Sequence, residues 1–189
     1  MKVSREQMAQ NRGRILDVAS RLFREKGFDA VSVAEVMKAA GLTHGGFYGH
    51  FSSKDDLVAQ TITCALAGDR GRGSDLRSYM DSYLSPRHRD DAADGCPTAG
   101  LAGDIRHQTA EARLAMTKGL RSQIDRISQA LPAMSATDRR RAAIGSWAAM
   151  VGAMILARAT DDPELSDEIL AQTRAWIDVG IGQVSALAP

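Results

Sequence analysis

Apolar residues recur at every third or fourth position along most of this 189-residue chain, and no run of β-branched residues alternates with polar ones as in a strand. Aromatic residues make up only 5%, whereas Ala, Leu, Met, Arg and Gln, which suit helices, are frequent. We therefore expect an all-α fold of about nine helices. The expected helices cover residues 7–26, 33–40, 43–51, 53–66, 76–84, 97–108, 110–131, 137–159 and 164–186.

Composition and cysteine content narrow the class of protein. The chain has 44% apolar and 25% charged residues, as in soluble globular proteins. Its two cysteines, Cys64 and Cys96, are too few for a disulfide framework, which favours a reducing compartment. No apolar signal segment opens the sequence, and the apolar run 142–157 is shorter than the roughly 20 residues of a membrane span. We expect a cytoplasmic protein with no membrane span, and no motif indicates a cofactor or a metal site.

Charge is distributed unevenly along the sequence. Residues 1–54 contain nine Lys or Arg against five Asp or Glu, whereas residues 55–189 contain fifteen against eighteen. A basic first quarter on an acidic body suggests one end that faces nucleic acid. An ordinary solvated surface gives a similar small excess, so both interpretations stay open.

Residues 33–51 have the layout of two short helices joined by a tight turn, which is a helix-turn-helix. We expect Ser32 to cap the first short helix, with Glu35 three residues later completing a capping box. Gly41 is expected to end that helix. Gly27, in a left-handed conformation, is expected to end the longer helix before it.

The second short helix has the features of an element that contacts DNA. Its start, residues 43–46, lacks bulky side chains, so backbone N–H groups can approach a phosphate at the positive helix end. Thr43 is the expected N-cap, and Phe47 and Phe51, four residues apart, are the expected anchors in the core. The side chains expected to reach phosphates or base edges are those of Tyr48, His50 and Lys54. The alternative is that the paired glycines mark a loop and that the two Phe are ordinary core.

Two segments of this region resemble the DNA-binding domain of the tetracycline repressor (TetR) family. They are SVAEV at residues 32–36 and the ungapped stretch AAGLTHGGFYGHFSSKDDL at residues 39–57. The resemblance extends over about residues 12–60, because the preceding helix has apolar and glycine residues in the family's order. Those residues are Ile15, Ala19, Leu22, Phe23, Gly27 and Phe28.

The resemblance implies a dimeric transcriptional regulator, usually a repressor. Residues 1–53 would form a three-helix domain that binds a palindromic double-stranded DNA operator. Residues 54–189 would form a helical domain that binds a small-molecule effector and forms the homodimer. A population shift on effector binding would then lower operator occupancy.

The resemblance also implies roles for single residues. Contacts to the DNA backbone, or orientation of the helix, are implied for Ser32, Thr43, Tyr48, His50 and Lys54. Positions facing bases are implied for His44, Gly45 and Gly46. The chain departs from the family's pattern at Gly49, where relatives often have a large aromatic or basic residue. This departure puts the sequence preference in doubt.

The last two expected helices, residues 137–159 and 164–186, are apolar on more than one face and contain small residues such as Gly145 and Gly152. A helix that is apolar all round must be covered on both sides. We expect these two helices to form a four-helix interface with a second copy of the chain. The alternative is the core of a monomer.

An effector site is expected among aromatic and Met residues of the C-terminal domain, with an apolar or aromatic ligand. Cys96 precedes Pro97 at an expected helix N-terminus, where a thiolate is favoured, so it could sense oxidants or electrophiles. For all of these residues the alternative is ordinary core, and we expect Cys64 in the core. The candidate effector-binding residues are Tyr79, Tyr83, Cys96, Met116, Leu120, Trp147 and Met150.

Two other function classes compete with a regulator. One is a small helical enzyme with Cys96 as nucleophile and His107 as base. The other is a helical protein whose basic end binds nucleic acid without sequence preference. The sequence contains no nucleotide-binding loop or metal motif that would favour the enzyme.

Overall fold

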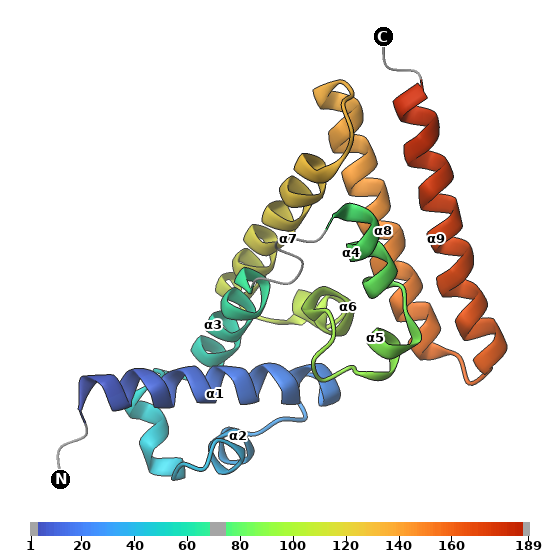
Figure 1. The fold of residues 1–189 in the computed structure, drawn as a ribbon. Helices are drawn as coiled ribbons and strands as arrows, with labels where there is room; N and C mark the ends of the chain where they lie inside the picture. The colour runs from blue at the N-terminus through green and yellow to red at the C-terminus, as the bar shows by residue number, and fades with distance from the viewer. Residues whose placement is uncertain (1–3, 69–74, 187–189) are drawn as a thin grey trace. The chain divides into compact units, whose positions relative to one another are not determined.

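The computed structural model describes residues 4–68 and 75–186, which form nine α-helices and two 3-10 helices with no β-strand in these ranges (Figure 1). The expected all-α fold is confirmed. The α-helices are α1 (Arg5–Lys26), α2 (Val33–Ala39), α3 (Lys54–Ala67), α4 (Leu76–Tyr83), α5 (Pro86–Asp90), α6 (Pro97–Leu101), α7 (Ala110–Ala130), α8 (Ala136–Ala159) and α9 (Pro163–Ala186). The 3-10 helices are η1 (His44–Gly49) and η2 (Ile105–His107).

The helices divide into two compact units. Unit 1 contains α1, α2, η1, α3, α6, η2 and the first half of α7, and unit 2 contains α4, α5, the second half of α7, α8 and α9. The division falls within α7, after Gly119. Helix α3 belongs to unit 1 because it packs along α1. The compact units therefore do not coincide with the domains 1–53 and 54–189 that the resemblance implies.

Helix α1 is the longest element of unit 1 and carries its core. Ser4 caps it by accepting a hydrogen bond from the Gln7 backbone N–H at 3.1 Å. Ile15 and Phe23 of the expected apolar stripe are fully buried. The helix ends at Gly27 with φ +79° and ψ 168°. The positive φ requires glycine, as expected. The large ψ, however, makes Gly27 extended, so the expected left-handed helical conformation is wrong.

A buried arginine holds α6 and the segment before it against α1. Arg24 is 8% exposed, and its guanidinium donates to the Ala93 carbonyl at 2.5 Å and to Ser20 Oγ at 2.6 Å. Gly100 of α6 lies so close that a Cβ there would be 3.2 Å from Arg24 Cγ. A buried guanidinium is stable only when its donors are used, so these bonds fix the segment in place.

Helices α3 and α7 cross at a glycine. A Cβ built on Gly119 would lie 2.6 Å from the Cβ of Leu66, which no real pair of side chains tolerates. Glycine is therefore required for this approach of the two helices.

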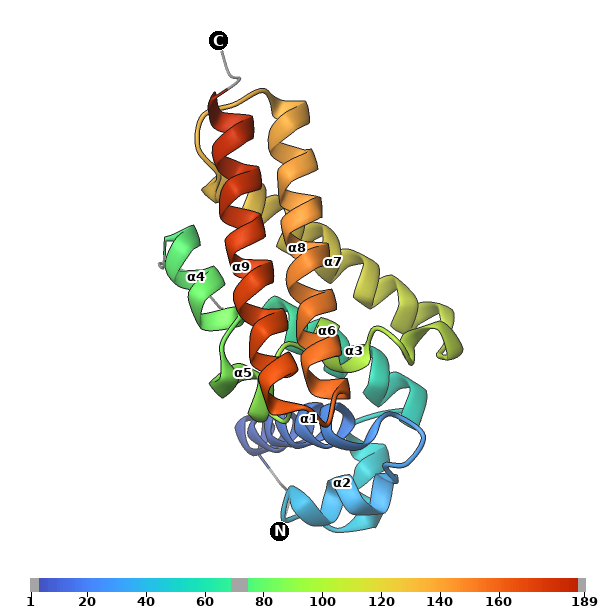
Figure 2. The same cartoon turned by 90° about the vertical axis from the view of Figure 1, so that its right-hand side faces the viewer.

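In unit 2, α8 and α9 pack side by side as a helical hairpin (Figure 2). By length and apolar composition α8 alone among the described helices could cross a membrane. Its side facing the interior of unit 2 is, however, buried, including Trp147, Met150 and Met154. This burial is the arrangement of a core helix.

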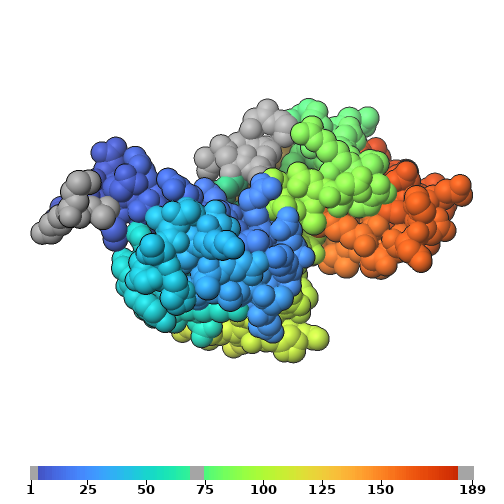
Figure 3. Space-filling view, turned by 90° about the horizontal axis from the view of Figure 1, so that it is seen from below, coloured from blue at the N-terminus to red at the C-terminus, as the bar shows by residue number. Residues whose placement is uncertain are grey.

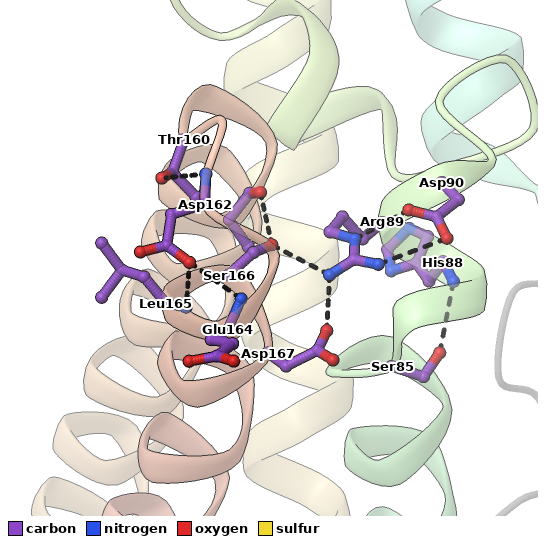
Figure 4. A network of polar contacts seen from close by, with 11 residues as sticks. Ser85, His88, Arg89, Asp90, Thr160, Asp162, Glu164, Leu165, Ser166 and Asp167 are labelled. Carbon is purple, nitrogen blue, oxygen red and sulfur yellow. Dashed lines mark hydrogen bonds and ion pairs between the residues drawn. The ribbon is translucent and has the colours of Figure 1, made fainter.

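Two arginines attach α5 to the α8–α9 hairpin, and Figure 4 shows the contacts of one of them, Arg89. Arg89 donates to Ser166 Oγ at 2.9 Å and to the Asp167 carboxylate at 2.6 Å. Arg158 of α8 donates to the carbonyls of His88 and Arg89, at 2.7 and 2.9 Å. The last carbonyls of a helix generally lack an intrahelical donor, and here Arg158 supplies donors from α8.

Two sequence-based boundaries are wrong. Residues 86–90 were expected as a loop, but they form α5, because Ser85 caps it and Pro86 occupies its first position, where proline is favoured. The helix expected over 97–108 is divided into α6 and η2. The glycines Gly100 and Gly103 weaken a continuous helix there.

Candidate nucleic-acid interface

Helix α2 and η1 form the expected two-helix corner of unit 1. Gly41 makes the turn with φ +69°, and the Leu42 N–H donates to the Met37 carbonyl at 2.9 Å. The second element is a 3-10 helix, whereas we had expected a regular helix through residue 51. Three of its six residues are glycine, which has a low helix propensity, and short 3-10 turns are the common result. Thr43 occupies the N-cap position of η1 but makes no side-chain capping bond.

The start of α2 has the predicted capping box. Ser32 Oγ accepts from the Glu35 backbone N–H at 3.1 Å. The pKa of the Glu35 carboxyl is lowered first by a hydrogen bond from Lys26 and also by the backbone N–H of Ser32. Lys26 Nζ lies 2.6 Å from this carboxylate. The Ser32 side chain is exposed, so its hydroxyl can still donate to a phosphate.

The tip of η1 is open on the surface of unit 1. Thr43, His44, Gly45 and Gly46 are all exposed, and a Cβ built on Gly45 would meet nothing within 4 Å. Tyr48 is 71% exposed. Figure 3 shows the α2 and η1 segments, in light blue to cyan, together on the outside of the unit. The backbone of the tip is therefore accessible to a large ligand, with the Gly46 N–H already donating to the Thr43 carbonyl at 3.0 Å.

Phe47 and Phe51 hold this exposed element on the core. They are 1% and 2% exposed, and their rings stack with centroids 5.6 Å apart. Tyr48 meets the Phe47 ring edge-on at 5.3 Å. The two anchors thus point inward while their neighbours point outward, as a surface-reading helix requires.

His50 and Lys54 follow the tip and are both partly buried. Burial, and secondly the positive charge of Arg12, lower the pKa of His50. The neutral imidazole, with one ring nitrogen as donor and the other as acceptor, is therefore favoured over the charged form. Lys54 is the first residue of α3, directly after the capping residue Ser53.

Sequence reasoning missed three residues that surround this element. Arg12 of α1 donates hydrogen bonds to the His50 carbonyl and to Gln60 Oε1 of α3. Gln60 in turn donates to the Asp56 carboxylate at 2.6 Å. The four-residue spacing of Asp56 and Gln60 is visible in the sequence, but the contact between Arg12 and His50 spans 38 residues and leaves no local signal.

The candidate effector-binding residues fall in both units. In unit 2, Tyr79 and Tyr83 have ring centroids 6.1 Å apart, and Tyr83 meets Trp147 edge-on at 5.4 Å. Trp147 Nε1 is buried and has no hydrogen-bond partner among the described residues. Met150 is also buried in unit 2, and Leu120 is half-buried on α7. Met116, buried, belongs to unit 1.

Neither cysteine is in a disulfide. Cys96 is the N-cap residue of the short helix α6 and is 6% exposed. His107 is exposed, and its Nε2 lies 2.9 Å from Arg106 Nε. Cys64 is exposed on α3, so its expected place in the core is wrong. It lies on the outer side of α3, two residues beyond the buried Ile62.

Comparisons with known proteins agree with this geometry. Residues 15–61 match the family model of the bacterial regulatory proteins of the tetR family. The chain is 42% identical over 57 residues to the HTH-type transcriptional regulator AcrR of Shigella flexneri, covering 30% of this chain and 26% of AcrR. It is 29% identical over 132 residues to the HTH-type transcriptional repressor NemR of Escherichia coli K12, covering 64% of this chain and 66% of NemR.

A solved structure extends the likeness beyond the N-terminal unit. The reduced form of E. coli NemR superposes with a TM-score of 0.73 at 22% identity, covering 89% of this chain and 95% of that chain. At this identity the comparison establishes the fold. In sequence, the chain spans about a quarter of the length of AcrR and just under two thirds of NemR.

The lowered pKa of His50 gives a pH-dependent stability. A group with a depressed pKa in the folded state favours folding above its unfolded pKa, about 6.5 for histidine, and loses that contribution as the pH falls below it. Between about pH 7 and about pH 5 the free energy of unfolding should therefore fall more in the wild type than in His50→Gln. Urea denaturation of both proteins measures this difference, and an equal fall in both would contradict it.

Proposed function

We propose that this chain is a regulator of the tetR family, whose model matches residues 15–61, and that it acts in the cytoplasm as a homodimeric repressor that a small effector releases from a palindromic operator. The observation that carries the proposal is the open tip of η1, held outward by the buried Phe47 and Phe51. The named relatives are transcriptional regulators, and no observation favours a catalytic use of Cys96 and His107.

The exposed residues at the tip suit the two kinds of DNA contact. We assign His44, Gly45 and Gly46 to base edges, because all three residues are exposed. Polar side chains around the tip are assigned to the DNA backbone, where contacts fix register and not sequence. These are Ser32, Thr43, Tyr48, His50 and Lys54.

Helices α8 and α9 supply the dimer interface in this proposal. Large apolar side chains remain exposed on both helices, and Gly145, Gly152 and Gly180 on the same helices have open space where a Cβ would be. Such a face is expected to be covered by a partner, and its counterpart on a second copy forms a four-helix bundle. The exposed apolar residues are Ile144, Ile155, Leu156, Leu165, Trp176 and Val179.

The effector is proposed to be an apolar, aromatic molecule that carries a hydrogen-bond acceptor. Trp147 offers a buried donor without a partner, next to the ring of Tyr83. A buried unsatisfied donor is costly, so a ligand acceptor at this position would gain free energy. The burial of Cys96 gives an electrophile less access than a reactive cysteine requires.

Release of the protein from its operator follows from thermodynamic linkage between effector binding and DNA binding. In a dimer bound to successive major grooves, the two η1 elements are held about 34–36 Å apart. An effector lowers operator occupancy only if it binds more tightly to a conformation with a different separation.

The DNA-binding proposal is tested with a duplex that the wild-type protein selects from a random pool. Lys54→Ala should weaken binding and reduce the slope of log Kobs against log salt by about 1.8, because the dimer loses two phosphate contacts, one from each protomer. Tyr48→Ala should also weaken binding, whereas Arg121→Ala, at an exposed position of α7 in unit 2, should not. Equal affinity of the wild type for selected and unselected duplexes would support binding without sequence preference and end the proposal.

The dimer is tested with Trp176→Glu. Trp176 is 63% exposed, and a carboxylate at this position would be desolvated in the interface, so the variant should sediment as a monomer. Leu114→Glu, at a residue 53% exposed on α7 in unit 1, serves as the matched control and should stay dimeric. Sedimentation equilibrium at several concentrations distinguishes the species. A wild-type monomer would refute the interface.

The effector site is tested by comparing aromatic ketones with hydrocarbons of the same size. Trp147→Phe keeps a ring but removes the donor, so it should bind ketones about two- to tenfold more weakly and bind hydrocarbons as the wild type does. Calorimetric titration of the dimer gives both affinities. An equal loss for both ligand classes would mean that the indole acts by packing alone.

A further inference from the structure

Arg12 is placed where three parts of unit 1 meet. It lies in the middle of α1, half-buried, and its guanidinium donates to the His50 carbonyl directly after η1 and to Gln60 in α3. Its Cζ lies 4.4 Å from the centroid of the Phe51 ring. One side chain thus contacts the end of η1, its aromatic anchor and the neighbouring helix.

The α3 side of this contact is itself fixed. Gln60 Nε2 donates to Asp56 Oδ1 at 2.6 Å, and Asp56 Oδ2 accepts from both the backbone N–H and the hydroxyl of Ser52, at 2.9 and 3.1 Å. Ser52 follows directly after Phe51. The chain of bonds therefore runs from η1 through Arg12 to α3 and returns to the segment that joins η1 to α3.

The element that Arg12 contacts is weak without such support. A 3-10 helix has poorer hydrogen-bond geometry than an α-helix, and three of the six residues of η1 are glycine. Carbonyls at a helix end have no partner within the helix, and His50 lies at this end. A charge-assisted bond from a guanidinium to that carbonyl is stronger than a neutral one and has a fixed direction.

We propose that Arg12 is a positioning residue, which fixes η1 against α1 and α3 and so sets operator affinity without contacting DNA itself. This inference rests on the proposed DNA-binding function. Without the Arg12 contacts, η1 samples orientations that do not bind, and the apparent affinity falls with the fraction of competent molecules. The carbonyl, the Gln60 oxygen and the Phe51 ring occupy the guanidinium, so it has a structural role where a phosphate-binding arginine would present its fork to solvent.

The salt dependence of binding separates positioning from phosphate contact. The full-length dimer is titrated with the duplex selected by the wild type. Arg12→Met should bind about tenfold more weakly at constant salt with an unchanged salt slope, because no counterion-releasing contact is lost. Arg12→Lys keeps the charge but cannot reproduce the fork, so it should bind as weakly as Arg12→Met. Arg121→Met, which removes an exposed charge from α7 in unit 2, is the matched control and should bind as the wild type.

A neutral residue tests the same link from α3. Gln60→Ala should weaken binding with an unchanged slope. The double variant Arg12→Met/Gln60→Ala should lose less binding free energy than the sum of the two single losses, since both substitutions break the contact between Arg12 and Gln60. Thermal unfolding by circular dichroism checks that unit 1 remains folded in each variant. Retained binding by a variant that lacks either side chain would overturn the proposal.

Two results locate a failure. A slope reduced by about 1.8 in the Arg12→Met dimer, restored in Arg12→Lys, would make Arg12 a phosphate ligand and overturn the positioning role. If the wild type binds no duplex with sequence preference, the DNA-binding function itself fails. That outcome is recognised before any Arg12 variant is measured.

Discussion

The burial of two phenylalanine rings is the constraint on which the DNA-facing end of this protein depends. Phe47 and Phe51 stack in the core of unit 1 and provide the apolar burial of a short element whose other residues are glycine or exposed polar side chains. Because the anchors supply the packing, the tip can remain without bulk. A phosphate binds at a helix start only if the backbone there is exposed. In this protein the stacked Phe47 and Phe51 keep η1 folded although its start is exposed.

Arginines connect segments that are distant in the sequence, within each unit. Arg24 holds the segment before α6 on α1, and Arg12 joins η1 to α1 and α3. In unit 2, Arg89 and Arg158 attach α5 to the α8–α9 hairpin. In three of these cases the guanidinium donates to a backbone carbonyl, and Arg89 donates to side chains of α9. Guanidinium groups suit this role because their several donors have a fixed geometry. Short helices with few apolar residues are thereby held without a large core of their own.

The glycines illustrate how one residue type serves different purposes. Gly41 permits a positive φ in the turn, Gly119 permits the approach of α3 and α7, and Gly152 and Gly180 leave open space on the proposed dimer face. Their places in the sequence do not distinguish these roles. Only the neighbouring atoms do, since a missing Cβ matters where another atom lies close or where an L-residue would be strained.

The sequence by itself determined the all-α fold, the main helix boundaries, the capping of α2 and the outward-facing tip of η1, because apolar periodicity, capping residues and turn glycines are local signals. The 3-10 form of η1 and the helix at residues 86–90 have local causes, which are the glycines of η1 and the Ser85–Pro86 start of α5. Tertiary structure alone decided that Cys64 is exposed and that Arg12 meets His50 and Gln60. These features depend on what packs against a residue from elsewhere in the chain. A contact between residues 38 or 48 positions apart produces no pattern in the local sequence of either segment. It can be identified only from the folded structure, where the two segments meet.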